Sequence, residues 1–458
     1  MGARPPAHGM RTFFIVWIGQ LASTLGSNLA GFALGVWIYE TTGSETLFAF
    51  SMLAWVLPNI LLAPLAGVIA DRWDRRLVMI LSDSLAASGT LMVSVLLFSG
   101  HLAVWHVYIA SFLDSTASTL QWPAHSAATS LMVPKEHLGR AGGLTQIGQA
   151  ISQLVAPAAA GALYVTLGPL AILLVDLAAY ALAMGTLLIV RFPQPEVTAE
   201  GQAGRGSFWK EALFGWGYIR ARTGLFGLLI IFAVGNFLFS LTNPLMMPLL
   251  LDISSPDVVG YVSSIFGLGM LIGTLVMSIW GGPRRRIYGI VLFDSLTGLF
   301  GMLYGLRPSV PLIAAAAFGI AFNMPIVNGC SQAIWQSKVA QDVQGRVFAA
   351  RRMIAFSIMP LAYLIAGPLA EHVFEPLLVE GGPLASSVGR VIGVGAGRGT
   401  GLLFMLVGVL YTLTTLIILI HPRIRRVELE LPDAIPDSEE VGEAAPIPEG
   451  EATPSPAK

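Results

Sequence analysis

Long apolar stretches alternate with short polar segments along almost the whole chain. An α-helix needs about 20 apolar residues to cross about 30 Å of hydrocarbon. Twelve stretches of this kind are present, so the pattern predicts twelve membrane-spanning helices. The first six cover residues 13–39, 46–70, 77–98, 104–129, 141–165 and 169–190. The second six cover residues 224–250, 258–280, 287–306, 310–333, 347–372 and 400–420.

The distribution of Lys and Arg tests this count, because cytoplasmic loops of membrane proteins are enriched in both residues. With the N-terminus inside, all but three of the 26 Lys and Arg residues fall on the cytoplasmic side. The exceptions are Arg307, Arg390 and Arg398. A wrong number of spans would scramble this alternation. The charges therefore predict a multi-pass protein with both termini in the cytoplasm.

The two halves of the chain resemble each other. Three short patterns of the first half recur in the same order in the second half, at offsets between 202 and 211 residues. In one of them, Arg75-Arg76 followed by Asp83 recurs as Arg285-Arg286 followed by Asp294. This predicts an all-α membrane protein of two pseudo-symmetric six-helix bundles. We assign residues 1–190 to the first bundle, 191–222 to a cytoplasmic linker with an amphipathic segment, 223–421 to the second bundle and 422–458 to a disordered acidic C-terminal tail.

Composition excludes several classes of function. Hydrophobic side chains make up 55% of the 458 residues and charged ones 12%, which is not a soluble composition. Cys330 is the single cysteine, and the His residues show no metal-ligand spacing. No Walker sequence and no Ser/His/Asp set is present. We therefore expect no enzyme site, no cofactor and no metal, and no nucleic-acid partner, because topology already explains the basic residues.

A charged hairpin separates the second and third predicted spans. Residues 67–76 read G-V-I-A-D-R-W-D-R-R, and charge this dense between two spans must lie at a membrane surface. The hairpin resembles the loop between helices 2 and 3 of major facilitator superfamily transporters, whose pattern is roughly G-x-x-x-D-R-x-G-R-R. The matching residues are Gly67, Asp71, Arg72, Arg75 and Arg76. Asp74 stands where the family usually has glycine; the alternative is a generic positive loop.

In this resemblance the hairpin is a gate. The Asp71 carboxylate can meet the positive end of a helix dipole or the guanidinium of Arg75. The resemblance implies a partner at the start of helix 11, here residues 345–352. Contacts formed in one state and broken in another would bias alternating access. The second half keeps the basic residues in 281–286 but has no Asp there.

Residues 112–140 resemble the helix 4–5 region of bacterial macrolide-efflux proteins, and enterobactin exporters share the general pattern. The resemblance implies a monomeric secondary active exporter in the bacterial cytoplasmic membrane. We expect it to export small amphipathic drug-like or natural-product molecules (macrolide-type) by proton-coupled antiport. The alternatives are a siderophore or peptide-product exporter, and a non-transporting membrane sensor on a transporter fold.

Four carboxyls lie within predicted spans and are candidates for proton coupling. Asp114 replaces the arginine of the efflux pattern and lies about 15 Å into its helix, where an ionised carboxylate is costly. It either binds a proton or hydrogen-bonds a neighbouring helix. Asp83 and Asp294 lie nearer the cytoplasmic face, and we expect them to pair with loop arginines. Asp176 matches an Asp common in the efflux pattern.

Polar amides within the spans are candidates for a substrate cavity between the bundles. Gln146, Gln149 and Gln153 recur at helical spacing, so they share a face that should meet protein or water. Helix–helix hydrogen bonding is the alternative explanation. Residues 156–161 are a degraded form of the antiporter G-P-x-x-G-G motif, whose small residues permit close helix contact. The other candidates are Gln20, Asn28, Asn236, Asn243, Asn323 and Asn328.

Overall fold

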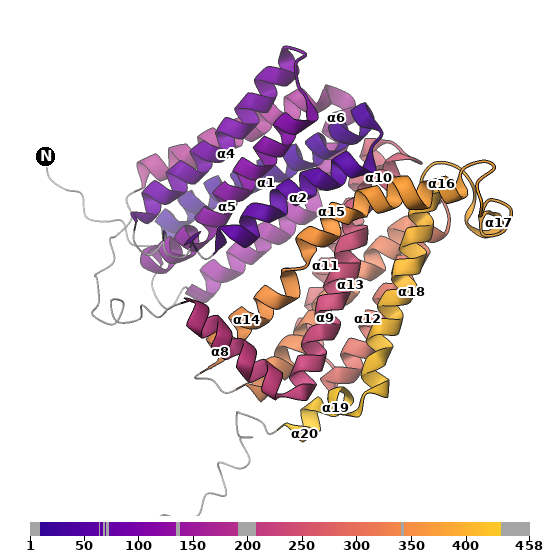
Figure 1. Cartoon of the computed structure of the whole chain (residues 1–458). Coiled ribbons are helices and arrows are strands. Elements are labelled where there is room, and N and C mark those ends of the chain that lie inside the picture. Colours follow the sequence, from indigo (N-terminus) through magenta and orange to yellow (C-terminus); the bar gives the residue numbers. More distant parts are fainter. Residues whose placement is uncertain are drawn as a thin grey trace, which may run out of the picture.

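A computed structural model describes residues 10–63, 65, 66, 69, 73–133, 138–190, 208–339 and 343–431. Helices dominate these residues, and no strand occurs among them (Figure 1). The first half contains α1 (Met10–Thr42), α2 (Glu45–Leu61), α4 (Arg75–Phe98), α5 (Val104–Met132) and α6 (Leu138–Ile189). The 52-residue α6 contains two spans, because Gly168 at a φ of 77° breaks the helix just before Pro169.

The second half begins with α8 (Phe208–Ala221), which coincides with the amphipathic segment predicted in the linker. The remaining elements are α9 (Thr223–Thr242), η2 (Asn243–Leu245), α10 (Met246–Leu251), α11 (Pro256–Trp280), α12 (Arg286–Leu306), α13 (Val310–Lys338), α14 (Gln344–Phe356), α15 (Met359–Leu369), η3 (Ala370–Phe374), α16 (Glu375–Leu378), α17 (Gly389–Ile392), α18 (Arg398–Ile420), α19 (Pro422–Arg425) and α20 (Val427–Glu430).

The helices account for the predicted spans. Nine helical stretches of the described residues are long and apolar enough to cross a membrane, and the one at Ala141–Ile189 supplies two crossings. The shorter α2 and the 29-residue α5 occupy the two remaining predicted spans. Residues 347–372, predicted as one helix, are divided among α14, α15 and the start of η3. The prediction of a twelve-helix, two-bundle membrane protein is confirmed.

Within each bundle, small residues let the helices approach closely. In the second bundle, Gly305 of α12 faces Gly401 of α18, and a Cβ atom on Gly305 would lie 2.1 Å from the Gly401 carbonyl oxygen. Such contacts hold helices together in lipid, where apolar side chains gain little by leaving the solvent. Larger side chains fill the remaining space, and Trp335 and Tyr304 are fully buried.

The two bundles converge at one end and diverge at the other (Figure 1). We call the end that carries the start of α4 and the start of α12 the basic end, because Arg76, Arg286 and Lys338 lie there. The opposite end carries Glu45 and Asp252, and we call it the acidic end. Within the part of the chain that the structure describes, the hydrogen bonds between the bundles lie toward the acidic end.

The tail prediction is wrong for residues 422–431. These residues form α19 and α20, and the side chains of Ile424 and Val427 are buried in the core of the second bundle. The Glu428 carboxylate accepts hydrogen bonds of 3.1 Å from the backbone N–H groups of Arg286 and Ile287. It thereby caps the N-terminus of α12, which has no cap from its own neighbour Arg285. Residues 432–458 lie outside the described residues.

Candidate functional site

The gating motif is only partly visible, because Gly67, Asp71 and Arg72 lie outside the described residues. Its Asp74 is the N-cap of α4 and accepts hydrogen bonds from the backbone N–H groups of Arg76 (2.8 Å) and Leu77 (3.2 Å). This explains an aspartate where the family usually has glycine, since carboxylates are good N-caps. The predicted contact of Asp71 with residues 345–352 stays a prediction.

Arg76 ties the start of α4 to the end of α6. Its Nε atom donates to the Leu187 carbonyl oxygen at 2.6 Å, and its Nη2 atom donates to the Leu188 carbonyl oxygen at 2.8 Å. These carbonyls belong to the last turn of α6, where carbonyl oxygens have no N–H donor within the helix. Arg76 therefore fixes the geometry of the basic end of the first bundle, whereas Arg75 simply begins α4.

Two carboxyls of the first bundle belong to one chain of polar groups. The Tyr180 hydroxyl donates to Asp114 Oδ1 at 3.1 Å and lies 2.8 Å from the Ser27 hydroxyl. Ser27 also faces Asp176, whose Oδ2 atom accepts a hydrogen bond of 2.8 Å from Thr90. The other Asp176 oxygen is buried without a partner. Two hydroxyl groups, each able to donate and accept a hydrogen bond, thus lie between Asp114 of α5 and Asp176 of α6.

Nothing that neutralises a carboxylate is recorded beside Asp114 in the described part of the chain. Its partners are Tyr180 and Trp55, both uncharged. Asp114 is half-buried, and Asp176 is only 1% exposed. An ionised carboxylate at such depth without a cation is unfavourable, so this arrangement suits a carboxyl that carries a proton in this conformation.

Asp83 lies in a second polar cluster of the first bundle. Its oxygens accept hydrogen bonds from the side-chain amides of Gln121 (2.7 Å) and Gln20 (3.3 Å), and the Gln121 amide also bonds Gln20 at 3.0 Å. In the second bundle, Asp294 accepts a 2.8 Å hydrogen bond from Tyr411. The expectation that Asp83 and Asp294 pair with loop arginines is therefore wrong. Neutral groups of neighbouring helices satisfy them because the arginines lie at the helix ends.

The amides predicted to line a cavity are found in different surroundings. Asn28, Gln146, Gln153 and Asn328 are exposed, and Gln149 is half-buried. Asn236 donates to the Ala355 carbonyl oxygen at 3.1 Å, which joins α9 to α14, and Asn243 accepts a 3.5 Å hydrogen bond from Tyr363. Asn323 is 1% exposed, so its side chain packs inside the second bundle instead of facing open space. Gln20 belongs to the Asp83 cluster.

Sequence reasoning missed a polar contact between α2 and α5. The Asn59 side chain donates to Ser115 Oγ at 2.7 Å and accepts from Thr119 Oγ1 at 2.9 Å. Ser115 in turn donates to the Trp55 carbonyl oxygen. An Asn inside the predicted span 46–70 was the available signal. This contact fixes α2 beside the stretch of α5 that carries Asp114.

The bundles come into close backbone contact along α6 and α11. A Cβ atom on Gly260 would lie 2.4 Å from the Pro157 carbonyl oxygen, and one on Gly161 would lie 2.5 Å from the Pro256 carbonyl oxygen. The Ala158 backbone N–H donates to Ser264 Oγ at 3.1 Å across the same contact. Residues 156–161 thus make the close helix contact expected of small residues. On the same helix, Gln146 is exposed nearer the basic end.

At the acidic end, polar groups join the two bundles along what we call the acidic seam. The Tyr39 hydroxyl donates to Asp252 Oδ1 at 2.6 Å, Ser44 Oγ donates to Glu371 Oε2 at 2.9 Å, and Thr400 Oγ1 donates to Glu45 Oε1 at 2.7 Å. Burial raises the pKa of the Asp252 carboxyl, and the Tyr39 hydrogen bond opposes that shift. These residues were not predicted as functional, because each lies at or beyond the edge of a predicted span.

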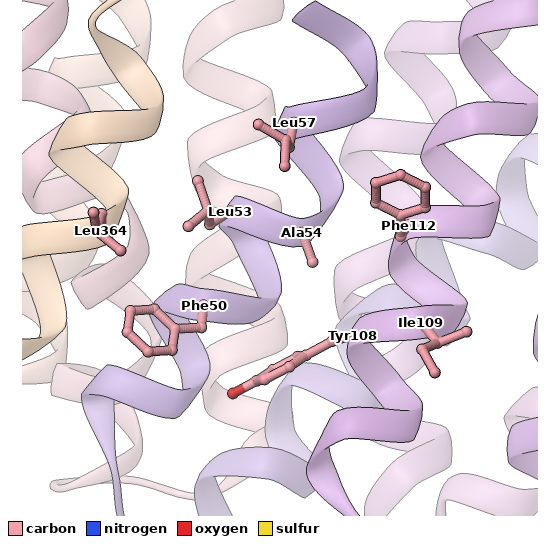
Figure 2. A pocket seen from close by; sticks show the side chains of 8 residues that line it. All are labelled: Phe50, Leu53, Ala54, Leu57, Tyr108, Ile109, Phe112 and Leu364. Carbon is pink, nitrogen blue, oxygen red and sulfur yellow. The ribbon is translucent and has the colours of Figure 1, made fainter. Parts of the chain in front are cut away.

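An apolar groove of about 430 Å³ crosses the junction of the bundles. Figure 2 shows that Leu364 projects from α15 of the second bundle, whereas the other lining side chains come from α2 and α5 of the first. The lining residues are Phe50, Leu53, Ala54, Leu57, Tyr108, Ile109, Phe112 and Leu364. Within the described residues, no cluster of His, Cys, Asp and Glu could hold a metal ion.

Solved structures with a similar fold are membrane transporters. The nucleoside transporter NupG aligns with a TM-score of 0.64 at 14% identity, covering 90% of this chain and 100% of that chain. A bacterial homolog of the human lysosomal transporter Spinster, inward-facing and unoccupied, aligns with a TM-score of 0.66 at 13% identity, covering 90% of this chain and 98% of the other. The fold is thus that of a membrane transporter.

The sequence identifies the family. Residues 16–363 match the profile of the Major Facilitator Superfamily, and the chain belongs to this family. Macrolide efflux protein A of Streptococcus pyogenes is 29% identical over 367 residues, which cover 79% of this chain and 90% of the relative. The Enterococcus faecalis protein of that name is 30% identical over 325 residues (70% and 99%). Multidrug efflux pump Tap of Mycolicibacterium fortuitum is 23% identical over 371 residues (78% and 88%).

Proposed function

We propose that this transporter exports amphipathic drug-like or natural-product molecules, of the macrolide type, from the bacterial cytoplasm in exchange for protons. The similarity to macrolide efflux proteins over most of both chains supports the substrate class. The apolar groove between α2, α5 and α15 suits the hydrophobic part of such a solute. The exposed amides of α6 offer hydrogen-bond partners for its polar groups.

The basic end faces the cytoplasm in this proposal. Lys and Arg collect at the basic end, as they do in cytoplasmic loops. Among the described residues, the hydrogen bonds between the bundles lie toward the acidic end, which supports a conformation closed toward the outside. A substrate would enter between the bundles from the basic end.

The observation that supports proton coupling is the hydrogen-bonded chain from Asp114 through Tyr180 to Ser27, which lies beside Asp176. Asp114 would bind the proton, and Asp176 with its unpartnered oxygen would share it. Rearrangement of α5 against α6 would break the Tyr180 contact and change the proton affinity of Asp114. Such a change between two conformations is what couples proton movement to substrate movement.

Uptake of a radiolabelled macrolide into everted membrane vesicles with an imposed pH gradient tests this function. We expect gradient-driven uptake by the parent protein and loss of the gradient effect in Asp114→Asn, because an amide cannot exchange the proton. Asp257→Asn is the control, since Asp257 pairs with Ser255 at the start of α11, away from this network. Gradient-driven uptake that survives in Asp114→Asn would contradict the assignment of Asp114, and gradient-independent flux in the parent would contradict proton coupling.

A further inference from the structure

Glu45 is a buried carboxyl held across the two bundles. It is the first residue of α2 in the first bundle and is 4% exposed. Its Oε1 atom accepts a 2.7 Å hydrogen bond from the hydroxyl of Thr400, which lies on α18 of the second bundle. Opening the bundles at the acidic end must therefore separate this pair and expose Glu45 to water.

The groups around Glu45 are mostly acidic. Glu375, Asp252 and Glu371 act on it electrostatically, and all three repel a negative charge there. Arg398 is a buried cation of this region; it is 3% exposed and acts on Glu375 and Asp252. Its Nη1 and Nη2 atoms form no hydrogen bond.

Each of the other carboxyls has a compensating partner. Asp252 and Glu375 both interact electrostatically with the Arg398 cation. Asp252 also accepts a hydrogen bond from Tyr39, and Glu375 accepts one of 2.8 Å from the Thr400 backbone N–H. Glu371 accepts from Ser44 and from the Thr46 backbone N–H, and its neighbour His372 also favours its charged form. Glu45 has only the Thr400 hydroxyl, which is uncharged.

The second carboxyl oxygen of Glu45 lacks a hydrogen-bond partner. Glu45 Oε2 is buried and has no hydrogen-bond partner. An ionised carboxylate with one bare oxygen, facing three other carboxyls, is strongly disfavoured away from water. A proton on Oε2 removes the charge while Oε1 keeps its bond to Thr400.

We propose that Glu45 is a second proton-binding carboxyl of this transporter, and that its proton must be bound before the acidic seam closes. Closing the seam removes Glu45 from water and takes up a proton, so lower pH favours the closed seam. In transport, which rests on the proposed function, Glu45 would take its proton from the side that the acidic end faces. The unloaded carrier could then return to the conformation described here only after a proton has arrived.

Distances between spin labels across the acidic seam test this proposal on the full-length protein. Thr41 on the first bundle and Ser386 on the second are exposed and can carry the labels, in a Cys330→Ala background. Distances are measured over the range of about pH 5 to 9, which covers the proton affinities that buried carboxyls reach. Glu45→Gln mimics the protonated side chain. Glu40→Gln is the matched control, because Glu40 is exposed and accepts from Tyr164 within the first bundle.

We expect the parent and Glu40→Gln to shift from short to long distances as the pH rises, and Glu45→Gln to keep the short distance throughout. Glu45→Asp retains a titrating carboxyl and should therefore keep a pH-dependent distance. This result would also show that the protein tolerates substitution at this position. A parent without a pH response, or Glu45→Gln with the parent's response, would overturn the proposal. The measurement needs neither substrate nor gradient, so it stands apart from the vesicle assay: proton-independent efflux would refute the proposed function alone.

Discussion

Gly260 of α11 lies so close to Pro157 of α6 that a Cβ atom on Gly260 would stand 2.4 Å from the Pro157 carbonyl oxygen. The two residues belong to different bundles, so this approach exists only while the bundles are closed here. The backbone oxygen cannot move aside as a flexible side chain could. A methyl group added at Gly260 should therefore destabilise the closed conformation without affecting a conformation in which these helices are apart.

Gly260→Ala should destabilise the closed conformation by about 1–3 kcal/mol, the usual cost of overpacking. The spin-label distance across the acidic seam should lengthen at constant pH, and efflux should fall. Gly142→Ala is the control, because a Cβ atom at Gly142 meets nothing within 4 Å. An unchanged distance in Gly260→Ala would show that the helices separate freely at this contact.

Tyr180→Phe should uncouple Asp114 from Asp176 while leaving both carboxyls in place. The variant loses the hydrogen bonds to Asp114 and Ser27, and the cost in folding stability should be about 1 kcal/mol for each bond. Proton release on substrate addition to the detergent-solubilised protein should fall markedly. Tyr164→Phe, which removes only a bond to the exposed Glu40, should release protons as the parent does. Equal proton release in both variants would remove Tyr180 from the pathway.

Arg76→Ala should lower the thermal stability of the protein. It removes two short, charged hydrogen bonds to the end of α6, worth about 1–3 kcal/mol together. Arg425→Ala serves for comparison, since Arg425 is recorded with one bond of 3.3 Å to the Leu419 carbonyl oxygen, at an exposed site. In a thermal-shift assay in detergent, Arg76→Ala should unfold at a lower temperature than Arg425→Ala. Similar unfolding temperatures would argue against a stabilising role of the Arg76 contacts with α6.

Two truncations should differ sharply in stability. Removing 432–458 leaves α19 and α20 in place and should hardly change the unfolding temperature. Removing 422–458 also deletes the buried Ile424 and Val427 and the Glu428 cap, at a cost on the order of 3 kcal/mol. Glu428→Gln should cost about 1 kcal/mol, because the amide is a weaker cap. Equal unfolding temperatures for the two truncations would mean that 422–431 contribute nothing to folding.

Some interactions seen here could not have been found from local sequence. Asp83 and Asp294 were expected to pair with loop arginines because these are the nearest charges along the chain. In the fold, amides from α1 and α5 reach Asp83, and a tyrosine from α18 reaches Asp294. Similarly, the acidic, proline-rich composition of the tail predicted disorder. In the fold, Glu428 near the start of the tail caps the N-terminus of α12.

The sequence by itself determined the number of spans, the two-bundle plan and the superfamily. The number of spans follows from the lengths of the hydrophobic runs, and a run is a local property that neighbouring residues encode. Only the tertiary structure decided which polar groups meet: Tyr180 and Asp114 are 66 residues apart, and Thr400 and Glu45 are 355 apart. Their pairing depends on how the helices pack and rotate against one another, and a single sequence contains no local signal for that packing.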